Sequence, residues 1–306
     1  MPGVAAASDL VVGVDGGGTK TLAVVVDRHG NEQGRASAGS SNYTAIGAEQ
    51  AATAVAQAVT DAVHLAGGRL PVQALWAGLS GIDRPGAREQ LHALIKPLAA
   101  DIRLTNDAEL IFSALAGGIG VVLIAGTGSI ALGRDASGAS ARAGGWGHLM
   151  GDEGSGYDIG RRALQSAAQA ADGRGPATAL LDAFLRHWQI DRPLDMIAHA
   201  YHSTDKATIA ELAAIAFAAS EAGDEVARRI IGTAAAELAK AAIAAAGQLA
   251  LPDDRLPLAL TGGLLTGHNG YRLSVLRRIR AHRRLGQVSV VTDPALSAAR
   301  SLIGGG

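Results

Sequence analysis

Residues 10–27 read LVVGVDGGGTKTLAVVVD, and this stretch decides how the rest of the chain is interpreted. Two apolar runs rich in valine, residues 10–14 and 22–26, flank a short polar turn. Short valine-rich runs bounded by turn residues are typical of β-strands, and so short a connection makes the second strand return antiparallel to the first. The stretch therefore predicts a hairpin with a glycine-rich turn.

The turn has the composition of an anion-binding site. Gly16, Gly17 and Gly18 leave the backbone free to approach a ligand, and the successive N–H groups of such a turn can converge on an anion. Thr19 and Lys20 add further donors, and a hard cation such as Mg²⁺ beside phosphates would explain the acidic Asp15. The turn is not a P-loop or a dinucleotide fingerprint, because those motifs lead from a strand into a helix. A hairpin turn without a ligand explains the same residues equally well.

The same plan occurs a second time. An apolar run at 121–125 leads into Gly126-Thr127-Gly128-Ser129 and then into a second apolar run at 130–133. Two strand–turn–strand segments, one at the head of each half, indicate a duplicated architecture with nucleotide between the halves. The glycine-rich segment 116–120 is the predicted boundary, which gives an N-terminal domain of residues 1–117 and a C-terminal domain of residues 118–306.

Composition limits the classes of protein to consider. A length of 306 residues favours two domains, and a net charge of −1 offers no basic face for nucleic acid or an anionic membrane. The absence of cysteine excludes disulfides, iron–sulfur clusters and thiolate-bound zinc. No apolar run is long enough to span a membrane, and no Lys or Arg precedes Lys20, so we expect no signal peptide and a cytoplasmic protein.

A candidate general base follows the predicted strand at 102–105. Asn106-Asp107-Ala108-Glu109 opens a helix, and Asp107 at the end of a strand can project into a cleft. The same residues resemble a capping box, in which Asn106 and Glu109 satisfy free N–H groups at the helix start. The sequence alone leaves both interpretations open.

Two further glycine-rich segments lie in the second half. Residues 144–157 read GGWGHLMGDEGSGY, where Trp146 offers a flat face to a sugar ring and Asp152 and Glu153 offer acceptors for hydroxyls or Mg²⁺-bound water. A surface loop with Trp146 packed on a core is the alternative. The predicted strand at 256–260 leads into TGGLL (261–265), where glycine allows the close approach of adenine and ribose or simply makes a turn.

The remaining elements follow from periodicity and from glycine and proline positions. The predicted strands are residues 31–38, 71–79 and 288–291. The predicted helices are residues 47–66, 87–98, 159–171, 177–188, 206–222, 224–249, 268–282 and a last helix starting at Pro294.

Taken in order, these motifs resemble the N-acetylglucosamine kinase family, in the BadF/BadG/BcrA/BcrD branch of the actin, Hsp70 and sugar-kinase superfamily. The matching segments are DGGGTKT (15–21), SSNYTAIG (40–47), LSG (79–81), NDAE (106–109), GTGS (126–129), GGWGH (144–148), GDEGSGY (151–157), TGGL (261–264) and PALSAA (294–299). The resemblance implies an α/β fold of two ribonuclease-H-like (actin-like ATPase) domains in a duplicated arrangement, with a nucleotide cleft between them. We also expect the C-terminal helix, about 294–306, to pack back onto the first domain.

The resemblance also implies an activity: phosphorylation of the 6-hydroxyl of N-acetylglucosamine by ATP with Mg²⁺, in a homodimer. It makes Asp107 the general base and Asp15 the acid that holds Mg²⁺ through water. The implied sugar-contacting residues are Asn42, Ser80, Asp107, Thr127, Gly145, Trp146 and Asp152. The implied nucleotide-binding residues are Gly17, Gly18, Thr19, Lys20, Thr127, Gly128 and Ser129 for the phosphates and Gly262 and Gly263 for adenosine.

Three rival functions differ in what they require of the sequence. An ATPase that activates a dehydratase needs cysteines for its iron–sulfur cluster, and this chain has none. A non-catalytic sugar- or ATP-sensing protein of this fold would want a helix-turn-helix ahead of the first strand, where only nine residues precede Leu10. A kinase of the same fold for glucosamine, N-acetylmuramic acid or glucose remains open.

Overall fold

The computed structural model describes residues 10–202, 205–251 and 255–303. The chain forms two compact units, one of residues 1–118 with 291–306 and one of residues 119–290. The short 3₁₀ turn η3 (Ala116–Gly118) ends the first segment of unit 1, within the glycine-rich stretch where the sequence places its domain boundary. Each unit is described below by itself.

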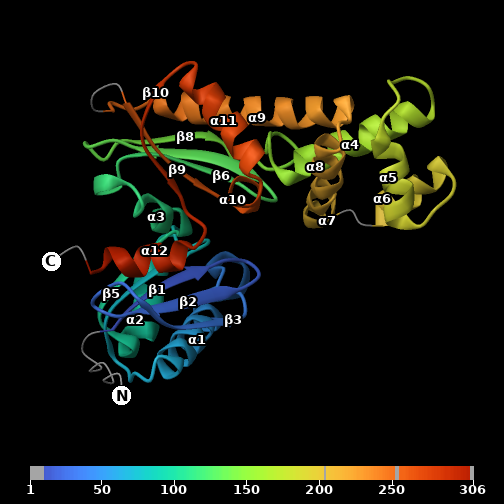
Figure 1. The fold of residues 1–306 in the computed structure, drawn as a ribbon. Helices are drawn as coiled ribbons and strands as arrows, with labels where there is room; N and C mark the ends of the chain where they lie inside the picture. Colours follow the sequence, from blue (N-terminus) through green and yellow to red (C-terminus); the bar gives the residue numbers. More distant parts are fainter. Residues whose placement is uncertain (1–9, 203–204, 252–254, 304–306) are drawn as a thin grey trace. The chain divides into compact units, whose positions relative to one another are not determined.

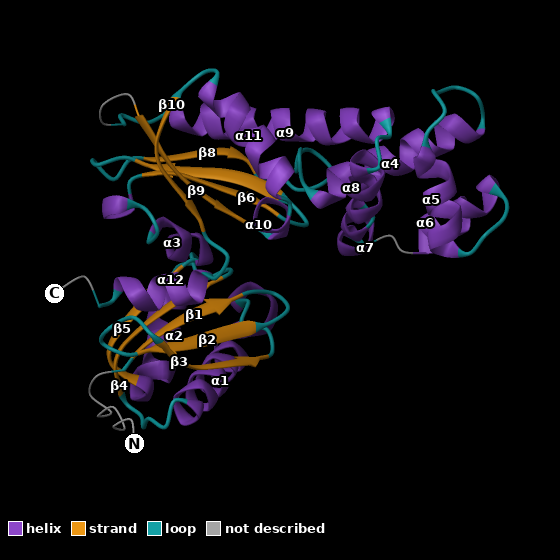
Figure 2. Cartoon of the chain, in the orientation of Figure 1, coloured by secondary structure: helices purple, strands orange, loops and turns teal. Residues whose placement is uncertain are grey.

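Unit 1 is built on a five-stranded mixed sheet (Figures 1 and 2). Its strands are β1 (Val11–Gly16), β2 (Thr21–Val26), β3 (Glu32–Ala38), β4 (Val72–Leu79) and β5 (Ala99–Thr105), in the spatial order β3-β2-β1-β4-β5. β1 pairs antiparallel with β2, from Val11 opposite Val26 to Gly16 opposite Thr21, which confirms the predicted hairpin. β4 and β5 continue the sheet in parallel with β1.

Helices cover both faces of this sheet because β1 and β2 are apolar on both. The helices are α1 (Tyr43–Leu65), α2 (Ala87–Ile95), the 3₁₀ turn η2 (Lys96–Leu98), α3 (Asp107–Phe112) and α12 (Pro294–Ser301). Val12 and Val14 pack with α1 on one face, whereas Val11 packs with α12 on the other, as the two-residue period of a strand requires. A Cβ at Gly13 would lie 1.9 Å from the Ala295 carbonyl oxygen, so glycine is what lets α12 lie against β1.

Unit 2 repeats the sheet of unit 1. Its strands are β6 (Gly120–Ala125), β7 (Ser129–Arg134), β8 (Ser140–Gly144), β9 (Arg255–Thr261) and β10 (Arg284–Val290), in the order β10-β9-β6-β7-β8. β6, β7 and β8 run antiparallel in sequence order, and β9 and β10 are parallel to β6, so the two sheets share one topology. This result confirms the predicted α/β class and its duplicated arrangement.

Alanine is the most frequent residue in the helical core of unit 2, in keeping with the low content of aromatic residues. The helices are α4 (Gly156–Ala171), α5 (Ala179–Trp188), the 3₁₀ turn η4 (Pro193–Asp195), α6 (Met196–His202), α7 (Lys206–Glu211), α8 (Ala213–Glu221), α9 (Glu225–Ala246), α10 (Gly263–Gly267) and α11 (Asn269–Arg280). The long helix α9 buries Ala234, Ala235 and Ala242 against the sheet and its neighbours. Within the described ranges, no helix combines the length and hydropathy needed to cross a membrane.

Several boundaries differ from the predictions. The predicted helix 206–222 is two helices, because hydrogen bonds from Leu212 N to Ile209 O and from Ile215 N to Leu212 O tighten the chain between them. The strand β8 and the helix α6 were not predicted. The sequence does not reveal β8 because this strand is short and buries only Ala141. α1 begins at Tyr43 rather than 47, with a kink at Gly47, whose φ is 80°. β10 runs from 284 to 290 instead of 288–291.

Candidate active site

The polar segments of unit 1 gather where its parallel strands end. β1 leads into the turn Gly17–Lys20, β4 into Ser80, and β5 into Asp107. The carboxyl ends of neighbouring parallel strands lie at one edge of a sheet, where open α/β sheets bind ligands. The Ser80 N–H donates to the Gly16 carbonyl at 2.8 Å, which ties the second of these segments to the first.

Asp107 is held in place by a side chain from the neighbouring strand. The Ser80 hydroxyl donates to Asp107 Oδ2 at 2.6 Å, and Asp107 is half-buried in the first turn of α3. Asn106 caps this helix, since its side chain accepts from the Glu109 N–H at 3.2 Å. The capping interpretation is therefore confirmed for Asn106, and this cap does not use the side chain of Asp107.

The glycine turn of unit 1 lines a cavity of about 440 Å³. The cavity is lined by Asp15, Gly17, Gly18, Thr19, Lys20, Leu22, Arg35, Thr292, Asp293 and Pro294. Burial, together with the negative charges of Asp107 and Asp293, raises the pKa of Asp15 to about 6, and Lys20 only partly opposes the rise. Asp293 pairs with Arg35 at 2.5 Å, so part of its charge is already compensated. A bound cation would relieve the remaining repulsion at Asp15.

The carboxylates of unit 1 do not form a complete metal-binding cage. Among the described residues, no three His, Asp or Glu side chains are grouped closely enough to hold a metal ion. Mg²⁺ usually keeps several waters and takes one or two carboxylates together with substrate phosphates. The residues present therefore fit an ion that Asp15 holds through water while the nucleotide supplies further ligands.

Asn42 lies beside the same turn. Its side-chain oxygen accepts from the Thr44 N–H at 3.0 Å and the Ala45 N–H at 3.3 Å, which caps α1. The preceding serine, Ser41, accepts a hydrogen bond from the Thr21 hydroxyl at 2.8 Å. These contacts hold segment 39–42 against the start of β2, and they leave the amide nitrogen of Asn42 as its available donor.

Three glycine segments of unit 2 converge at the carboxyl ends of β6 and β9. The Gly156 N–H donates to the Gly126 carbonyl at 2.8 Å, which joins the 151–157 loop to the 126–129 turn. A Cβ at Gly262 would lie 2.3 Å from the Ala125 carbonyl oxygen, so the 262–263 turn also packs against the end of β6. Thr127 is exposed at the tip of this arrangement.

Asp152 is buried beneath the 126–129 turn. Its side chain is 4 % exposed, and Oδ1 accepts from the Ser129 N–H at 3.1 Å. Oδ2 lies 2.7 Å from Nζ of Lys206, a residue that the sequence did not single out. The Asp152 backbone has φ 63°, a conformation that few residues other than glycine, asparagine and aspartate adopt readily. Asp152 thus connects the loop, the turn and the start of α7.

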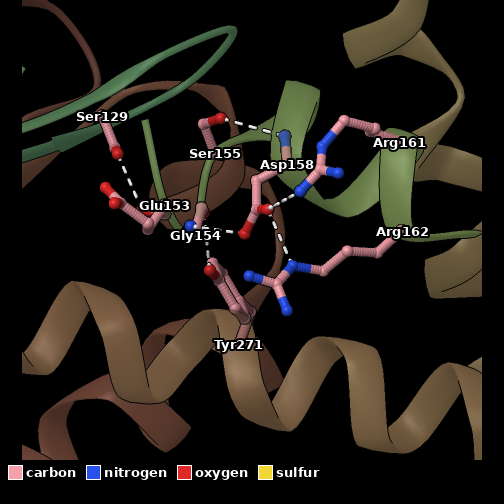
Figure 3. A network of polar contacts seen from close by, with 8 residues as sticks. All are labelled: Ser129, Glu153, Gly154, Ser155, Asp158, Arg161, Arg162 and Tyr271. Atoms are coloured by element: carbon pink, nitrogen blue, oxygen red, sulfur yellow. Dashed lines mark hydrogen bonds and ion pairs between the residues drawn. The ribbon is translucent and has the colours of Figure 1, made fainter. Parts of the chain in front are cut away.

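A second buried carboxylate, Asp158, holds the same loop from the other side (Figure 3). Asp158 Oδ2 accepts from the Gly154 N–H at 3.0 Å, and Oδ1 accepts from Arg162 Nε at 2.7 Å. The Tyr271 hydroxyl donates to the Gly154 carbonyl at 2.7 Å, which brings α11 into the network. Burial and the charge of Asp158 raise the pKa of Tyr271, so its hydroxyl stays protonated and can donate.

Two arginines of α4, Arg161 and Arg162, also belong to this network. Both pair with the buried Asp158, at 3.4 and 2.7 Å. A further link joins the loop to the turn, because the Ser129 hydroxyl donates to the Glu153 carbonyl at 2.7 Å. The loop is therefore fixed by side chains from several elements rather than by its own backbone alone.

Trp146 is 67 % exposed, in a loop that also exposes Leu149 and Met150. The alternative in which its ring packs on a core is therefore wrong for this structure. A Cβ at Gly145 would lie 2.5 Å from Ile130 Cδ1, and Gly145 has φ 69°, so glycine sets the path of the chain into Trp146. An exposed indole face of this kind is available to a sugar ring.

The sequence analysis missed four residues that complete the two sites: Asp158, Lys206, Tyr271 and Asp293. Asp293 carried a usable signal, because an Asp directly before a proline that starts a helix is a typical N-cap, and its side chain accepts from the Leu296 N–H. Lys206 also carried a usable signal, because lysine is rare in this chain. The four lysines are Lys20, Lys96, Lys206 and Lys240. Nothing in the local sequence of Tyr271 points to Gly154.

Two matching sheets with glycine turns at their carboxyl ends define the class of the actin-like ATPase folds. The family model described as the BadF/BadG/BcrA/BcrD ATPase family matches residues 12–281, and the chain belongs to this family.

Relatives with stated activities are similar over most of their length. An N-acetyl-D-glucosamine kinase of Dictyostelium discoideum is 33 % identical over 271 residues, which cover 83 % of this chain and 85 % of that protein. An N-acetylmuramic acid/N-acetylglucosamine kinase of Clostridium acetobutylicum is 34 % identical over 267 residues, covering 85 % and 86 %. The crystal structure of a candidate N-acetylglucosamine kinase from Chromobacterium violaceum has a TM-score of 0.74 and 29 % identity, and the match covers 97 % of this chain and 99 % of that one.

Proposed function

We propose that this protein is an ATP-dependent hexosamine kinase that transfers the γ-phosphate of ATP to the 6-hydroxyl of N-acetylglucosamine. The observation that carries the proposal is the hydrogen-bonded pair of Ser80 and Asp107 at the strand ends that also bear the glycine turn and Asp15. Membership of the ATPase family and the two amino-sugar kinases among the relatives support the same activity.

Asp107 acts as the general base in this mechanism. The Ser80 hydroxyl orients its carboxylate, which accepts the proton of the sugar hydroxyl as that oxygen attacks the γ-phosphorus. The new oxygen–phosphorus bond forms while the bond to the β-phosphate oxygen breaks, and ADP leaves. Phosphoryl transfer has a loose transition state, so positioning and charge neutralisation supply most of the catalysis.

The glycine turns hold the nucleotide. Backbone N–H groups of both turns and the Lys20 ammonium bind phosphate oxygens, and Gly262 and Gly263 let adenosine approach the backbone. The phosphate-binding residues in this proposal are Gly17, Gly18, Thr19, Lys20, Thr127, Gly128 and Ser129. Asp15 would hold Mg²⁺ through water, and the ion would supply positive charge that offsets the phosphates.

Six of the sugar contacts that the sequence predicts are retained in this proposal: Asn42, Ser80, Asp107, Thr127, Gly145 and Trp146. Asp152 is not retained, because its side chain is 4 % exposed and both of its oxygens are engaged by Ser129 and Lys206. The exposed ring of Trp146 and the free amide nitrogen of Asn42 support two of these assignments. We also propose that the protein works as a cytoplasmic homodimer.

The substrate is tested with a panel of sugars in a coupled assay of ADP release. We expect N-acetylglucosamine to give the highest kcat/KM, with N-acetylmuramic acid as the second candidate because one relative is named for both sugars. NMR of the product should show phosphate on oxygen 6, and 6-deoxy-N-acetylglucosamine should inhibit without releasing ADP. Faster turnover of glucosamine or glucose would make the named substrate wrong and leave the kinase assignment intact.

A further inference from the structure

The two glycine turns differ in where the lysine next to each of them lies in the sequence. The chain carries only four lysines among its 27 basic residues, and one of them, Lys20, lies inside the turn of unit 1. The 126–129 turn of unit 2 occupies the equivalent place between β6 and β7 and contains no basic residue. Lys206, at the first position of α7, nevertheless places its ammonium on that turn.

The ammonium pairs with Asp152 and lies next to Gly128. Lys206 Nζ lies 2.7 Å from Asp152 Oδ2. A Cβ built on Gly128 would lie 2.6 Å from the same Nζ and 2.9 Å from Asp152 Oδ1. The ammonium therefore lies against the bare face of Gly128, and any side chain at 128 would displace it.

The contact with Asp152 does not use all the N–H donors of the Lys206 ammonium. Asp152 Oδ2 is buried and receives no well-aligned hydrogen bond from the described residues, although Nζ is in contact with it. An ammonium has three N–H donors, more than one poorly aligned contact uses. The Lys206 side chain is 31 % exposed, so an anion can reach it from solvent, whereas its carboxylate partner is enclosed.

We propose that Lys206 is a phosphate-binding residue that contacts the β- and γ-phosphates of a nucleoside triphosphate held by the 126–129 turn. In this arrangement Asp152 positions the ammonium on the turn, and Lys206 supplies to unit 2 the charge that Lys20 supplies to unit 1. A lysine suits this role because its ammonium is a compact charge that approaches a phosphate from any direction. The inference rests on the proposed function, which assigns this turn to phosphate.

A purely structural role makes a different prediction. If Lys206 only neutralises the buried Asp152, its loss matters because it leaves a buried charge unpaired. Removing both charges should then restore stability and nucleotide affinity together. If Lys206 binds phosphate, removing both charges should restore stability alone.

The experiment compares Lys206→Met, Asp152→Asn and the double variant, each assayed by calorimetry with ATP, ADP and AMP in the presence of Mg²⁺. Lys240→Met is the matched control, because Lys240 pairs with Glu237 at 2.7 Å on the exposed face of α9. For Lys206→Met and for the double variant, we expect ATP to bind about 10- to 100-fold more weakly, the range of a lost charge-assisted hydrogen bond, and AMP to bind as in the wild type. Lys240→Met should bind all three nucleotides normally.

The double variant keeps the test decisive if Lys206→Met alone does not fold. Wild-type affinity for ATP in the double variant would overturn the inference, and so would an equal loss for ATP and AMP. A wild-type protein that binds ATP and phosphorylates a hexosamine while Lys206→Met binds ATP normally would refute the inference alone. A wild-type protein that does neither would instead refute the proposed function.

Discussion

The two units share one sheet topology but use their carboxylates in opposite ways. In unit 1, burial and the negative charges of Asp107 and Asp293 raise the pKa of Asp15 to about 6. In unit 2, Asp152 and Asp158 are buried, and each accepts a backbone N–H and pairs with a basic side chain. The comparison teaches that unit 1 leaves the buried Asp15 in a negative field that Lys20 only partly opposes, whereas unit 2 uses its acids to fix the loop next to the 126–129 turn.

The largest effect should come from removing the base of unit 1. Asp107→Ala should lower kcat by about 10²–10⁴-fold, the usual contribution of general base catalysis, and change the dissociation constant of the sugar little. Steady-state kinetics and calorimetry measure the two quantities. Asp101→Asn, which alters an exposed carboxylate on β5, is the matched control and should be as active as the wild type. Near-normal turnover of Asp107→Ala would remove this residue from the mechanism.

The next effect tests whether the acids of unit 2 are structural. Asp158→Asn should lower the free energy of unfolding by about 2–4 kcal/mol, because it removes the charge that pairs with Arg162 and Arg161 inside a buried network. Urea denaturation followed by circular dichroism measures the change. Asp172→Asn, whose partner Arg174 lies on the surface, is the control and should leave the unfolding midpoint nearly unchanged. An equal change in both variants would contradict the contrast between the units.

A smaller effect of opposite sign is expected at Asp15. Its folded pKa of about 6 exceeds the ordinary value of 3.8, so the folded state holds this proton more tightly than the unfolded state. The stability of the wild type should therefore fall as the pH rises from about 4 to about 6 and stay reduced above that range. Asp15→Asn should be more stable than the wild type by about 1–3 kcal/mol at pH 8 and lose this advantage near pH 4.

Thermal unfolding at both pH values measures the difference at Asp15, and Mg²⁺-dependent ATP binding should weaken in the same variant. A stability gain that is the same at pH 4 and pH 8 would show that the charge of Asp15 is not its cause. Loss of stability at pH 8 would contradict the idea that unit 1 keeps this charge at a cost.

The smallest effect concerns the orientation of the base. Ser80→Ala removes the 2.6 Å hydrogen bond to Asp107 and should lower kcat by about tenfold, because one such bond contributes about 1–1.5 kcal/mol. A loss as large as that of Asp107→Ala, or one confined to the KM for ATP, would indicate a role other than orientation.

Much of the fold could be predicted because it depends on local pattern. The hairpin at 10–27 and its copy at 121–133 show the short apolar runs and glycine turns that specify antiparallel strands. The placement of Ser80 and Asp107 at strand ends followed from the same pattern. The pairing of Lys206 with Asp152 and of Tyr271 with Gly154 could not be predicted, because it depends on packing between segments far apart in the chain.

The raised pKa of Asp15 could not be predicted from the sequence for the same reason. It arises from burial and from Asp293, which reaches unit 1 only because the chain returns there after β10. The sequence indicated the helix after Pro294 but gave no measure of how closely α12 approaches β1. Only the packing of Ala295 against Gly13 shows that approach.

That return of the chain has a consequence for biosynthesis. Residues 119–290 are contiguous, so a ribosome delivers everything that unit 2 needs in one uninterrupted stretch. Unit 1 lacks α12 until all of unit 2 has been translated, and Val11 and Val24 stay uncovered on one side until then. Unit 1 is therefore begun before unit 2 and completed after it, and its nascent sheet is the part that chaperones would need to protect.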